Sequence, residues 1–358
     1  MNREFEPACR RMEWLHPFYK QVWEKAFADG IPISGTFELT PRCNFNCRMC
    51  YVHLKPEQIP KYGTELTAKQ WIRIAEEAKE AGTTWLCITG GEPLLHPEFR
   101  TIYTELSQMG FFITLQTNGS LLEGERLELL EKYPPRGVKI TLYGSDDAVY
   151  QDVCQVPNGF TRVDYAIKEL KERKIPIQLV STIIQQNEKD VKNMAFYAYR
   201  NGMPWAMTEG IKPSARGAEN EAKQVRIERD KEKMFVERLR YMIKEKPFDQ
   251  SRKPCTYCKD YRLGYWVTWE GSMRFCSFMN EPNIPVRDMP FLDAWKQLLL
   301  YEETLDWPKE CQTCGVREGC SKCAGILASE SGSATKVNPE FCSRIKQYYD
   351  EKKGEWKI

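Results

Sequence analysis

The chain has 358 residues, with 52 basic and 50 acidic side chains and a formal net charge of +2. Charges of both signs are interspersed, so the composition indicates neither a nucleic-acid-binding stripe nor an acidic tail. The sequence contains neither an 18-residue apolar run nor an export signal, and we therefore expect a cytoplasmic protein without a membrane partner. In such a chain fourteen cysteines favour metal binding over disulfides. The length suits two domains.

The segment before the first expected strand is predicted to contain an amphipathic helix, bent at Pro17, that closes the bottom of the following domain. The first strand-like run follows this helix and ends at Thr40. The apolar positions of the helix are Met12, Leu15, Tyr19, Val22 and Phe27.

A loop with three cysteines comes next: Cys43, Cys47 and Cys50, spaced by three and then two residues. A four-iron, four-sulfide cluster needs one outside ligand per iron, so three thiolates leave one iron open to a small molecule. Ferredoxins, in contrast, close all four corners. A structural zinc site is the alternative, but zinc takes four closed ligands, and His53 lies too close to the loop to fold back as the fourth. The spacing therefore favours an open iron–sulfur cluster.

The first two-thirds of the chain alternate strand and helix. The clearest predicted helix spans residues 67–81, where Thr67 and Gln70 make a capping box and Gly82 ends the helix. Six strand–helix repeats predict a parallel sheet with functional residues at the carboxyl ends of its strands. The other predicted helices cover 97–109, 162–174 and 189–201, and the predicted strands end at Thr40, Gly90, Asn118, Gly144, Ile184 and Thr208.

A Gly-Gly-Glu turn, Gly90-Gly91-Glu92, ends the second predicted strand. Two glycines at a strand end let the backbone approach a ligand without obstruction by Cβ atoms. We expect the exposed N–H and C=O groups of this turn to hold an amino-acid end. Gly-Gly turns are common in loops and are weak evidence on their own. This turn follows the cysteine loop by one helix and one strand, so the two motifs reinforce each other.

Polar residues end the next two strands and are candidates for the same site. Thr117 and Asn118 end the third strand, and Tyr143 lies at the end of the fourth, close to Asp146 and Asp147. Tyr143, Asp146 or Asp147 could donate or accept a proton, and nothing in the sequence selects among them. The alternative is that Asn118 belongs to a plain turn and that Tyr143 is a half-buried packing residue.

Two polar stretches follow the sixth strand. The charged run 219–240 is predicted to be a solvated helix. The basic loop 212–217 could hold the carboxylate of a ligand or serve as a linker.

Outside the motifs, Cys87 is predicted to lie in the core and Cys9 has no partner. Cys154 also has no partner, with a resolving or thioether role as the minor alternative.

The C-terminal third contains eight further cysteines and a predicted hairpin, 265–269 and 272–276, around Gly271. Eight thiols would close two more four-iron clusters, but they would equally suit two zinc sites. These cysteines are Cys255, Cys258, Cys276, Cys311, Cys314, Cys320, Cys323 and Cys342.

The three-cysteine loop and the Gly-Gly-Glu turn together resemble those of the radical S-adenosylmethionine (radical SAM) enzymes. The resemblance implies an α/β fold, a partial (β/α)6 TIM-like barrel. It implies that Cys43, Cys47 and Cys50 hold a [4Fe-4S] cluster whose open iron is chelated by the methionine part of SAM.

The same resemblance implies further contacts with SAM. Gly90, Gly91 and Glu92 would flank its amino group, and Thr141 would lie near its ribose and carboxylate. The family usually has an aromatic residue before the third cysteine, where this chain has Met49. Met49 would then cover the adenine, with Tyr51 sharing the task. Many members have Asp where this chain has Tyr143. The cofactor-binding candidates are Met49, Tyr51, Gly90, Gly91, Glu92, Thr117, Asn118 and Thr141.

The C-terminal third resembles the SPASM domain, which implies two auxiliary [4Fe-4S] clusters and three clusters in all. Two spacings depart from the pattern: two residues separate Cys255 from Cys258 where several members have more, and two rather than three separate Cys320 from Cys323. Either departure could leave an auxiliary iron with a ligand other than cysteine. The implied domains are an N-terminal segment (1–32), the barrel (33–245) and the SPASM domain (246–358). The first cluster would bind Cys255, Cys258, Cys276 and Cys323, and the second Cys311, Cys314, Cys320 and Cys342.

The resemblance predicts an enzyme that cleaves SAM reductively to a 5′-deoxyadenosyl radical. The radical would abstract hydrogen from a peptide or protein for oxidative modification, a crosslink or side-chain oxidation. Two alternatives stay open: dehydrogenation or epimerisation of a small molecule such as a sugar or cofactor precursor, and a non-enzymic electron-transfer or zinc protein.

The expected partners follow from that chemistry. Many peptide maturases begin with a leader-binding module, and we expect the segment before the first strand to be too short for one. A peptide substrate would then need a separate recognition protein or direct binding in the barrel. A low-potential donor such as a ferredoxin or flavodoxin would supply the electron. No nucleic-acid partner is expected.

Overall fold

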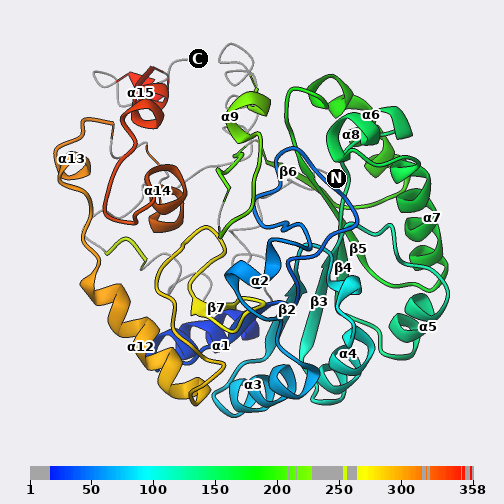
Figure 1. The fold of residues 1–358 in the computed structure, drawn as a ribbon, viewed down its shortest axis with the longest axis horizontal. Coiled ribbons are helices and arrows are strands. Elements are labelled where there is room, and N and C mark those ends of the chain that lie inside the picture. Colours follow the sequence, from blue (N-terminus) through cyan, green and yellow to red (C-terminus); the bar gives the residue numbers. More distant parts are fainter. Residues whose placement is uncertain are drawn as a thin grey trace.

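A curved eight-stranded sheet forms the centre of the molecule (Figure 1). The computed structural model describes residues 17–208, 210–214, 216–227, 253–255, 264–316, 320, 323–347, 349–350 and 355–356. The strand order is β6-β5-β4-β3-β2-β1-β7-β8; neighbours from β6 to β7 are parallel, and β8 runs antiparallel to β7. The strands are β1 (Ser34–Glu38), β2 (Trp85–Thr89), β3 (Phe112–Thr117), β4 (Gly137–Thr141), β5 (Ile177–Thr182), β6 (Trp205–Thr208), β7 (Gly264–Val267) and β8 (Met273–Arg274), while β9 (Tyr349–Asp350) and β10 (Glu355–Trp356) pair separately.

Helices follow the strands and lie along the outer side of the curved sheet, as Figure 1 shows for α3, α4, α5 and α7. The helices after each strand are α2 (Ile59–Tyr62), α3 (Ala68–Glu80), η2 (Pro93–Leu95), α4 (Phe99–Gln108), α5 (Glu125–Lys132), α6 (Asp147–Cys154), α7 (Gly159–Glu172), η3 (Glu188–Asp190), α8 (Val191–Arg200) and α9 (Ala222–Val225). The remaining helices are α1 (Pro17–Ala28), α12 (Phe291–Thr304), α13 (Lys309–Gln312), α14 (Ala324–Ser331) and α15 (Pro339–Gln347).

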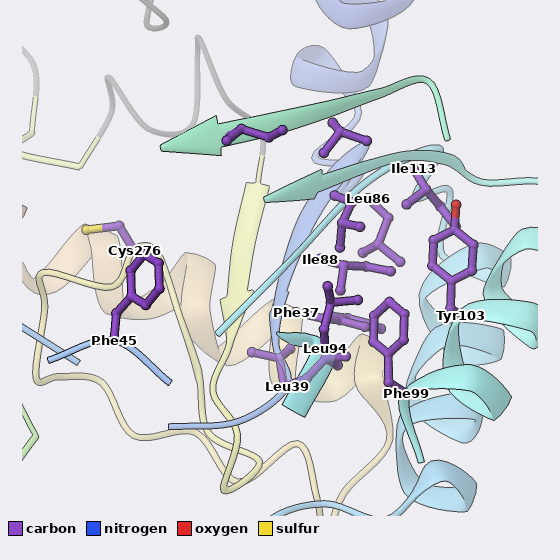
Figure 2. Close-up of a cluster of buried hydrophobic side chains, with 14 of the residues drawn as sticks. Phe37, Leu39, Phe45, Leu86, Ile88, Leu94, Phe99, Tyr103, Ile113 and Cys276 are labelled. Carbon is purple, nitrogen blue, oxygen red and sulfur yellow. The ribbon is translucent and has the colours of Figure 1, made fainter. Parts of the chain in front are cut away.

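The main core lies between the sheet and this helix layer (Figure 2). Side chains alternate along a strand, so Phe37 of β1 points toward the helices while its neighbour Glu38 points to the other face. The ring of Phe37 lies 4.8 Å from that of Trp71 on α3, and both residues are fully buried. Each such side chain contributes roughly 1.5–3 kcal/mol through burial. The packing leaves the inner face of the barrel free for polar residues.

The predicted barrel is confirmed. Each of the six predicted strands is present and ends within three residues of its predicted end, and the six pair in parallel in chain order. The α3 helix begins with the predicted capping box between Thr67 and Gln70. Its buried face, Trp71, Ile74, Ala75 and Ala78, is the one expected. The helices predicted at 97–109, 162–174 and 189–201 are α4, α7 and α8 with slightly different ends.

The predicted hairpin around Gly271 is present as β7 and β8, but it belongs to the barrel sheet. β7 pairs in parallel with β1, where Gly35 lies beside Tyr265. A Cβ atom on Gly35 would come within 2.3 Å of the Tyr265 ring, so glycine is required there. α12 covers Tyr265 through Phe291 and Trp295. The sheet therefore crosses the boundary expected at residue 245, and the domain division itself stays a prediction.

The predicted N-terminal helix is present as α1. Met12 and Leu15 lie outside the described residues, as does the run 228–240 of the predicted charged helix. Trp23 of α1 contacts Trp85 at the start of β2, with ring centroids 5.5 Å apart, so α1 covers the amino ends of the strands. Within the part of the chain that the structure describes, no helix is long and apolar enough to cross a bilayer.

Candidate active site

The three cysteines of the first motif lie together in the loop after β1, at the carboxyl edge of the sheet. Burial, followed by the nearby Cys47 and Cys50, raises the pKa of Cys43 well above its usual value. Burial and Cys47 raise the pKa of Cys50 to about 11. Cys43 and Cys50 therefore resist ionisation unless a positive charge compensates them. A metal cluster supplies that charge, because thiolates rather than thiols bind metal.

Hydrogen-bond donors surround these sulfur atoms. Cys43 Sγ accepts from the Phe45 N–H at 3.4 Å and from Asn118 Nδ2 at 3.8 Å. Backbone N–H groups of Val52 and His53 face Cys50. Donors of this kind support cluster thiolates, so the all-thiol loop fits an iron–sulfur cluster.

Among the described residues, no group of three or more His, Cys, Asp or Glu side chains converges closely enough to hold a single metal ion. A four-iron cluster does not need such convergence, because each of its irons takes a separate thiolate.

The Gly-Gly-Glu turn packs directly on the cysteine loop. A Cβ atom on Gly90 would lie 2.8 Å from the Thr40 carbonyl oxygen, and one on Gly91 would lie 2.4 Å from that of Arg42. The N–H groups of Gly91 and Glu92 donate to these two carbonyls, each at 2.7 Å. The expectation that these N–H groups face a ligand is therefore wrong, because the cysteine loop takes them. The two glycines allow the backbone of the turn to pack closely against the backbone of the cysteine loop.

Glu92 is fully buried, and its carboxylate joins the ends of β2 and β3. It accepts hydrogen bonds from Thr117 Oγ1 and from the Asn118 N–H, all at 2.8 Å, and from the Leu94 N–H at 3.1 Å. Burial raises the pKa of Glu92 to about 7, and the hydrogen bonds only partly offset that effect. Glu92 and Thr117 are thus engaged with each other.

The other residues that were predicted to lie near SAM are Asn118, Met49 and Thr141, and each has different surroundings. Asn118 lies against the cysteine loop, where it also donates to Asn44 Oδ1 at 2.9 Å. Met49 is buried in the main core. Thr141 ends β4 as expected, and its carbonyl faces the Tyr150 hydroxyl at 3.4 Å.

The acid–base candidates separate clearly in the structure. Asp146 is the N-cap of α6, where it accepts from the Val149 N–H at 2.8 Å. Asp147 accepts from the Thr161 hydroxyl and N–H. Tyr143 lies beside the cysteine loop, where burial, followed by the nearby Cys47, raises the pKa of its hydroxyl well above the usual value. Tyr143 is therefore the one of these three that reaches the candidate cluster site.

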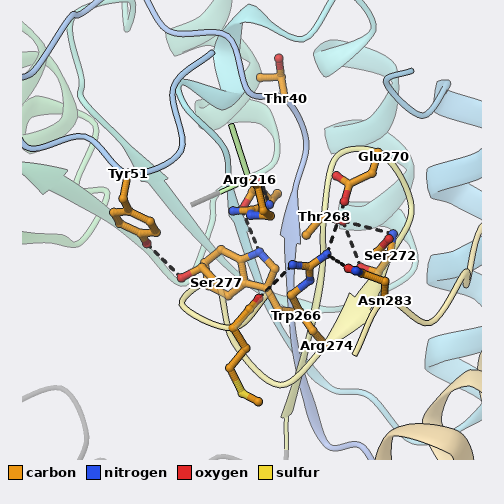
Figure 3. Close-up of polar contacts among 12 residues, drawn as sticks. Thr40, Tyr51, Arg216, Trp266, Thr268, Glu270, Ser272, Arg274, Ser277 and Asn283 are labelled. Carbon is orange, nitrogen blue, oxygen red and sulfur yellow. Dashed lines mark hydrogen bonds and ion pairs between the residues drawn. The ribbon is translucent and has the colours of Figure 1, made fainter. Parts of the chain in front are cut away.

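Tyr51 joins the cysteine loop to the C-terminal third. Its hydroxyl lies 3.0 Å from Ser277 Oγ, and its ring centroid is 5.1 Å from that of Phe278 (Figure 3). Tyr51 follows Cys50, and Ser277 follows Cys276. One hydrogen bond therefore links the residues next to two candidate cluster ligands.

A second group of thiols surrounds Gly325 at the start of α14. A Cβ atom on Gly325 would lie 2.8 Å from Cys276 Sγ and 3.8 Å from Cys323 Sγ. Two members of the predicted first auxiliary set thus share one small space. Cys255 is buried near Tyr301. Cys258 lies outside the described residues, Cys311 is on α13, Cys342 is on α15, and Cys314 and Cys320 lie in the loops between them.

Sequence reasoning missed a buried ion pair on the inner face of the barrel (Figure 3). Glu38, at the end of β1, accepts from both terminal nitrogens of Arg216 at 2.6 and 2.8 Å and from Trp266 Nε1 at 2.9 Å. Glu38 is the one charged residue of β1, and this was the signal that could have found the pair. Arg216, in the basic loop 212–217, holds this carboxylate of its own chain.

Comparison with protein families identifies the region around this site. Residues 37–198 match the model of the radical SAM superfamily. These residues form a radical SAM domain. A domain of this family binds SAM and an iron–sulfur cluster, and the expectation of an enzyme is confirmed with it.

The curated proteins to which the chain is similar carry several names. It is 26% identical over 306 residues to the sporulation killing factor maturation protein SkfB of Bacillus subtilis (strain 168), covering 79% of this chain and 72% of SkfB. It is 24% identical over 318 residues to the AdoMet-dependent heme synthase of Methanosarcina barkeri (strain Fusaro / DSM 804), covering 82% and 90% of the two chains.

The fold is shared with SuiB of Streptococcus suis, a protein solved bound to S-adenosylmethionine. The TM-score is 0.63 at 15% identity, over 94% of this chain and 82% of SuiB. Another structure of SuiB contains the precursor peptide SuiA.

Removal of Arg216 tests the buried pair. The side chains of Arg216 and Glu38 are 11% and 2% exposed, so Arg216→Ala leaves a buried carboxylate without its counter-ion. We expect the free energy of unfolding to fall by about 3–5 kcal/mol, measured by anaerobic chemical denaturation. The double variant Glu38→Leu/Arg216→Met should recover most of this loss.

The control for that variant is Arg100→Ala, which breaks an exposed pair with Glu125. It should cost less than about 1 kcal/mol. Equal losses in Arg216→Ala and Arg100→Ala would contradict a structural role for the buried pair.

The raised pKa of Glu92 predicts a pH dependence of stability. Between its ordinary value of 4.5 and about 7, the folded protein holds a proton that the unfolded chain has lost. Stability from this group is therefore greatest below pH 4.5 and falls as pH rises through 7. We expect the free energy of unfolding to drop by about 1–3 kcal/mol between pH 5 and pH 8 from this residue. Glu92→Gln should flatten that slope; parallel pH profiles for the two proteins would rule the assignment out.

Proposed function

We propose that the chain cleaves SAM reductively and uses the resulting radical to oxidise a peptide or protein substrate. The product would be a crosslink or an oxidised side chain. The observation that carries this proposal is the loop of three thiols at the carboxyl edge of a radical SAM barrel, with a second thiol group joined to it through Tyr51 and Ser277.

We assign Cys43, Cys47 and Cys50 as the ligands of the SAM-binding cluster. Three protein thiolates leave the fourth iron to the methionine end of SAM. With SAM bound to it, the reduced cluster would supply the one electron that splits SAM into methionine and a 5′-deoxyadenosyl radical, and this radical would remove a hydrogen atom from the substrate.

The protein's own residues hold this site in place and control its polarity. The N–H groups of Gly91 and Glu92 fix the cysteine loop, which leaves carbonyl oxygens of the turn as the groups that could accept from an amino group. The Glu38 carboxylate accepts hydrogen bonds from Arg216 and Trp266, so the ion pair forms a neutral inner wall. Tightly packed walls of this kind keep water from a reactive intermediate.

We assign Cys276 and Cys323 to one auxiliary cluster, with Cys255 and Cys258. We assign Cys311, Cys314, Cys320 and Cys342 to a second. Their place in the mechanism would be to take the electron that remains on the substrate after hydrogen removal. The closeness of Cys276 and Cys323 around Gly325 supports the first set.

A peptide substrate is favoured by two likenesses: SkfB is named a maturation protein, and SuiB has been solved with its precursor peptide. A small-molecule substrate is the second candidate, because the heme synthase is similar over a comparable length. A neighbouring gene for a short cysteine- or aromatic-bearing peptide would favour the first reading. Loss of hydrogen from that peptide, measured by mass spectrometry, would then decide for it.

The proposed chemistry needs a low-potential electron donor such as a ferredoxin or flavodoxin. A separate recognition protein for the peptide is a further proposed partner. The fourteen cysteines suit a reducing compartment, and we propose the cytoplasm as the site of action.

Cleavage of SAM is the first test. Anaerobically reconstituted chain, reduced with dithionite and given SAM, should form 5′-deoxyadenosine and methionine. Cys43→Ala, Cys47→Ala and Cys50→Ala should each lower product to the level without enzyme, because each removes a ligand. Cys87→Ala, which removes a thiol from β2, should retain the activity. Formation of 5′-deoxyadenosine by any of the three ligand variants at the unmodified rate would contradict the assignment.

Gly325→Ala tests the first auxiliary set. Three clusters bind about twelve iron atoms per chain, and the added methyl group would force Cys276 Sγ away, so we expect about four fewer. On helix propensity alone, alanine would instead stabilise α14 by about 1 kcal/mol. Cys276→Ala should show the same iron loss as Gly325→Ala, with iron measured after anaerobic reconstitution. Unchanged iron in both variants, or about four irons in the unmodified chain, would overturn the three-cluster proposal.

A further inference from the structure

The first half of the cysteine loop is attached to the barrel by its backbone. The Arg42 carbonyl accepts a hydrogen bond from the Glu92 N–H at 2.7 Å. The N–H groups of Asn46 and Arg48 donate to two carbonyls in the last turn of α6 at 3.0 and 3.1 Å, one of them the carbonyl of the fully buried Cys154. These bonds hold the backbone beside the first two cysteines of the loop.

The third cysteine is followed by an attachment through a side chain. Tyr51 comes directly after Cys50, and its hydroxyl lies 3.0 Å from the Oγ atom of the buried Ser277 (Figure 3). The Tyr51 ring also packs on the ring of Phe278, with centroids 5.1 Å apart. Ser277 and Phe278 follow Cys276 in the sequence. Both contacts of Tyr51 therefore reach the segment that carries a proposed auxiliary ligand.

The segment that Tyr51 contacts is itself held in place by Arg274. This side chain is fully buried, and it donates to the Met279 carbonyl at 2.9 Å and to Asn283 Oδ1 at 2.6 Å. The Met279 N–H in turn donates to the Cys276 carbonyl at 3.2 Å. Residues 276–279 thus form a fixed turn, which presents the Ser277 hydroxyl to Tyr51 from a rigid support.

Two further segments meet at Phe278. Lys212 Nζ, from the loop after β6, lies 5.6 Å from the centroid of the Phe278 ring, a cation–π contact. A Cβ atom on Gly325, at the start of α14, would lie 3.5 Å from Phe278 Cβ and 2.8 Å from Cys276 Sγ. The thiol of Cys276 and the Phe278 side chain therefore share one tightly packed space, so a shift of one is felt by the other.

We propose that Tyr51 is a positioning residue of the SAM-binding cluster, because it makes the retention of that cluster depend on the first auxiliary thiol set. The residues from 41 to 58 form no helix or strand, so fixing Cys50 costs conformational entropy that a contact can offset. With Cys276 engaged as a ligand, the turn 276–279 would be held further, and Tyr51 would pass this constraint to Cys50. The inference rests on the proposed function, since it takes Cys50 and Cys276 as cluster ligands.

The test follows the retention of the SAM-binding cluster in the anaerobically reconstituted full chain. The iron chelator bathophenanthroline disulfonate is added, and samples are reduced at intervals. The electron paramagnetic resonance signal that changes when SAM is added identifies the SAM-binding cluster, and its decay gives the rate of loss. Tyr51→Phe keeps the ring and removes the hydroxyl, whereas Ser277→Ala removes the partner of that hydroxyl.

We expect the SAM-responsive signal to decay roughly two to ten times faster in Tyr51→Phe and in Ser277→Ala, the effect of losing one hydrogen bond. The double variant should decay no faster than the faster single variant, because both changes remove the same bond. Cys276→Ala should also speed the decay. Adding Tyr51→Phe to Cys276→Ala should then have little further effect.

Tyr133→Phe is the matched control. The Tyr133 hydroxyl accepts from Gln108 Nε2 at 3.2 Å between α4 and α5, in the outer helix layer. This variant loses one tyrosine hydrogen bond away from the cysteine loop, so its decay rate should equal that of the unmodified chain. If the bond of Tyr51 only stabilised the fold, Tyr51→Phe would speed the decay equally with and without Cys276.

That equal acceleration would overturn the proposal, and so would unchanged decay in both Tyr51→Phe and Ser277→Ala. If Cys276→Ala does not fold, the cycle of Tyr51→Phe and Ser277→Ala decides, and additive effects in the double variant would overturn the proposal. If the unmodified chain forms 5′-deoxyadenosine in any of these cases, only the positioning role falls. Absence of any SAM-responsive signal in the unmodified chain would overturn the proposed function as well.

Discussion

Backbone contact between the cysteine loop and the Gly-Gly-Glu turn is the constraint on which the site depends. The residues from 41 to 58 form no helix or strand, so their thiols are placed by the surroundings of the loop. The turn after β2 meets the loop through hydrogen bonds to the Thr40 and Arg42 carbonyls. Any side chain at Gly91 would push into Arg42, so the two segments have one relative position. β2 in turn is fixed by its register with β1.

Buried acidic side chains at the strand ends hold neighbouring segments of the fold together. Glu38 ties β1 to β7 and to the loop after β6, and Glu92 ties β2 to β3. Asp190 accepts from the N–H and hydroxyl of Ser145, which joins the end of β4 to η3. Each carboxylate is paired or hydrogen-bonded, as burial requires. Hydrogen bonds and one ion pair of these carboxylates thus join the carboxyl ends of the strands to neighbouring segments.

The fold could be predicted because its signals are local. Alternating strand and helix patterns gave the parallel barrel, and the Thr67–Gln70 cap lies within one turn of chain. The motifs also placed Cys43 and Asn118 correctly at one edge. The hydrogen-bond partners of individual side chains could not be predicted in the same way. Asp146 was a candidate proton donor or acceptor from its position in the sequence. In the structure it is the N-cap of α6, and its carboxylate accepts a hydrogen bond from the first turn of that helix.

Contacts between segments that are distant in the sequence could not be predicted for a related reason. Spacing carries no information on the meeting of Cys47 and Cys154, since neither belongs to a motif that includes the other. The pairing of β7 with β1 is another example, because a short strand in a cysteine-rich region looks like a local hairpin. The hydrogen bond between Tyr51 and Ser277 is a further example, since the two residues are 226 positions apart. Non-local pairing is decided by packing, which one sequence does not display.

The seam between β1 and β7 has a consequence for how this enzyme can be divided. β1 lies inside the sheet because β7 covers one of its edges, and Tyr265 fills the groove over Gly35. A fragment cut before β7 would present β1 as a bare edge, with unpaired amide and carbonyl groups next to an apolar hollow. Such an edge invites pairing with another chain. The barrel sheet therefore depends on β7, a strand that comes from the cysteine-rich region, to cover the edge of β1.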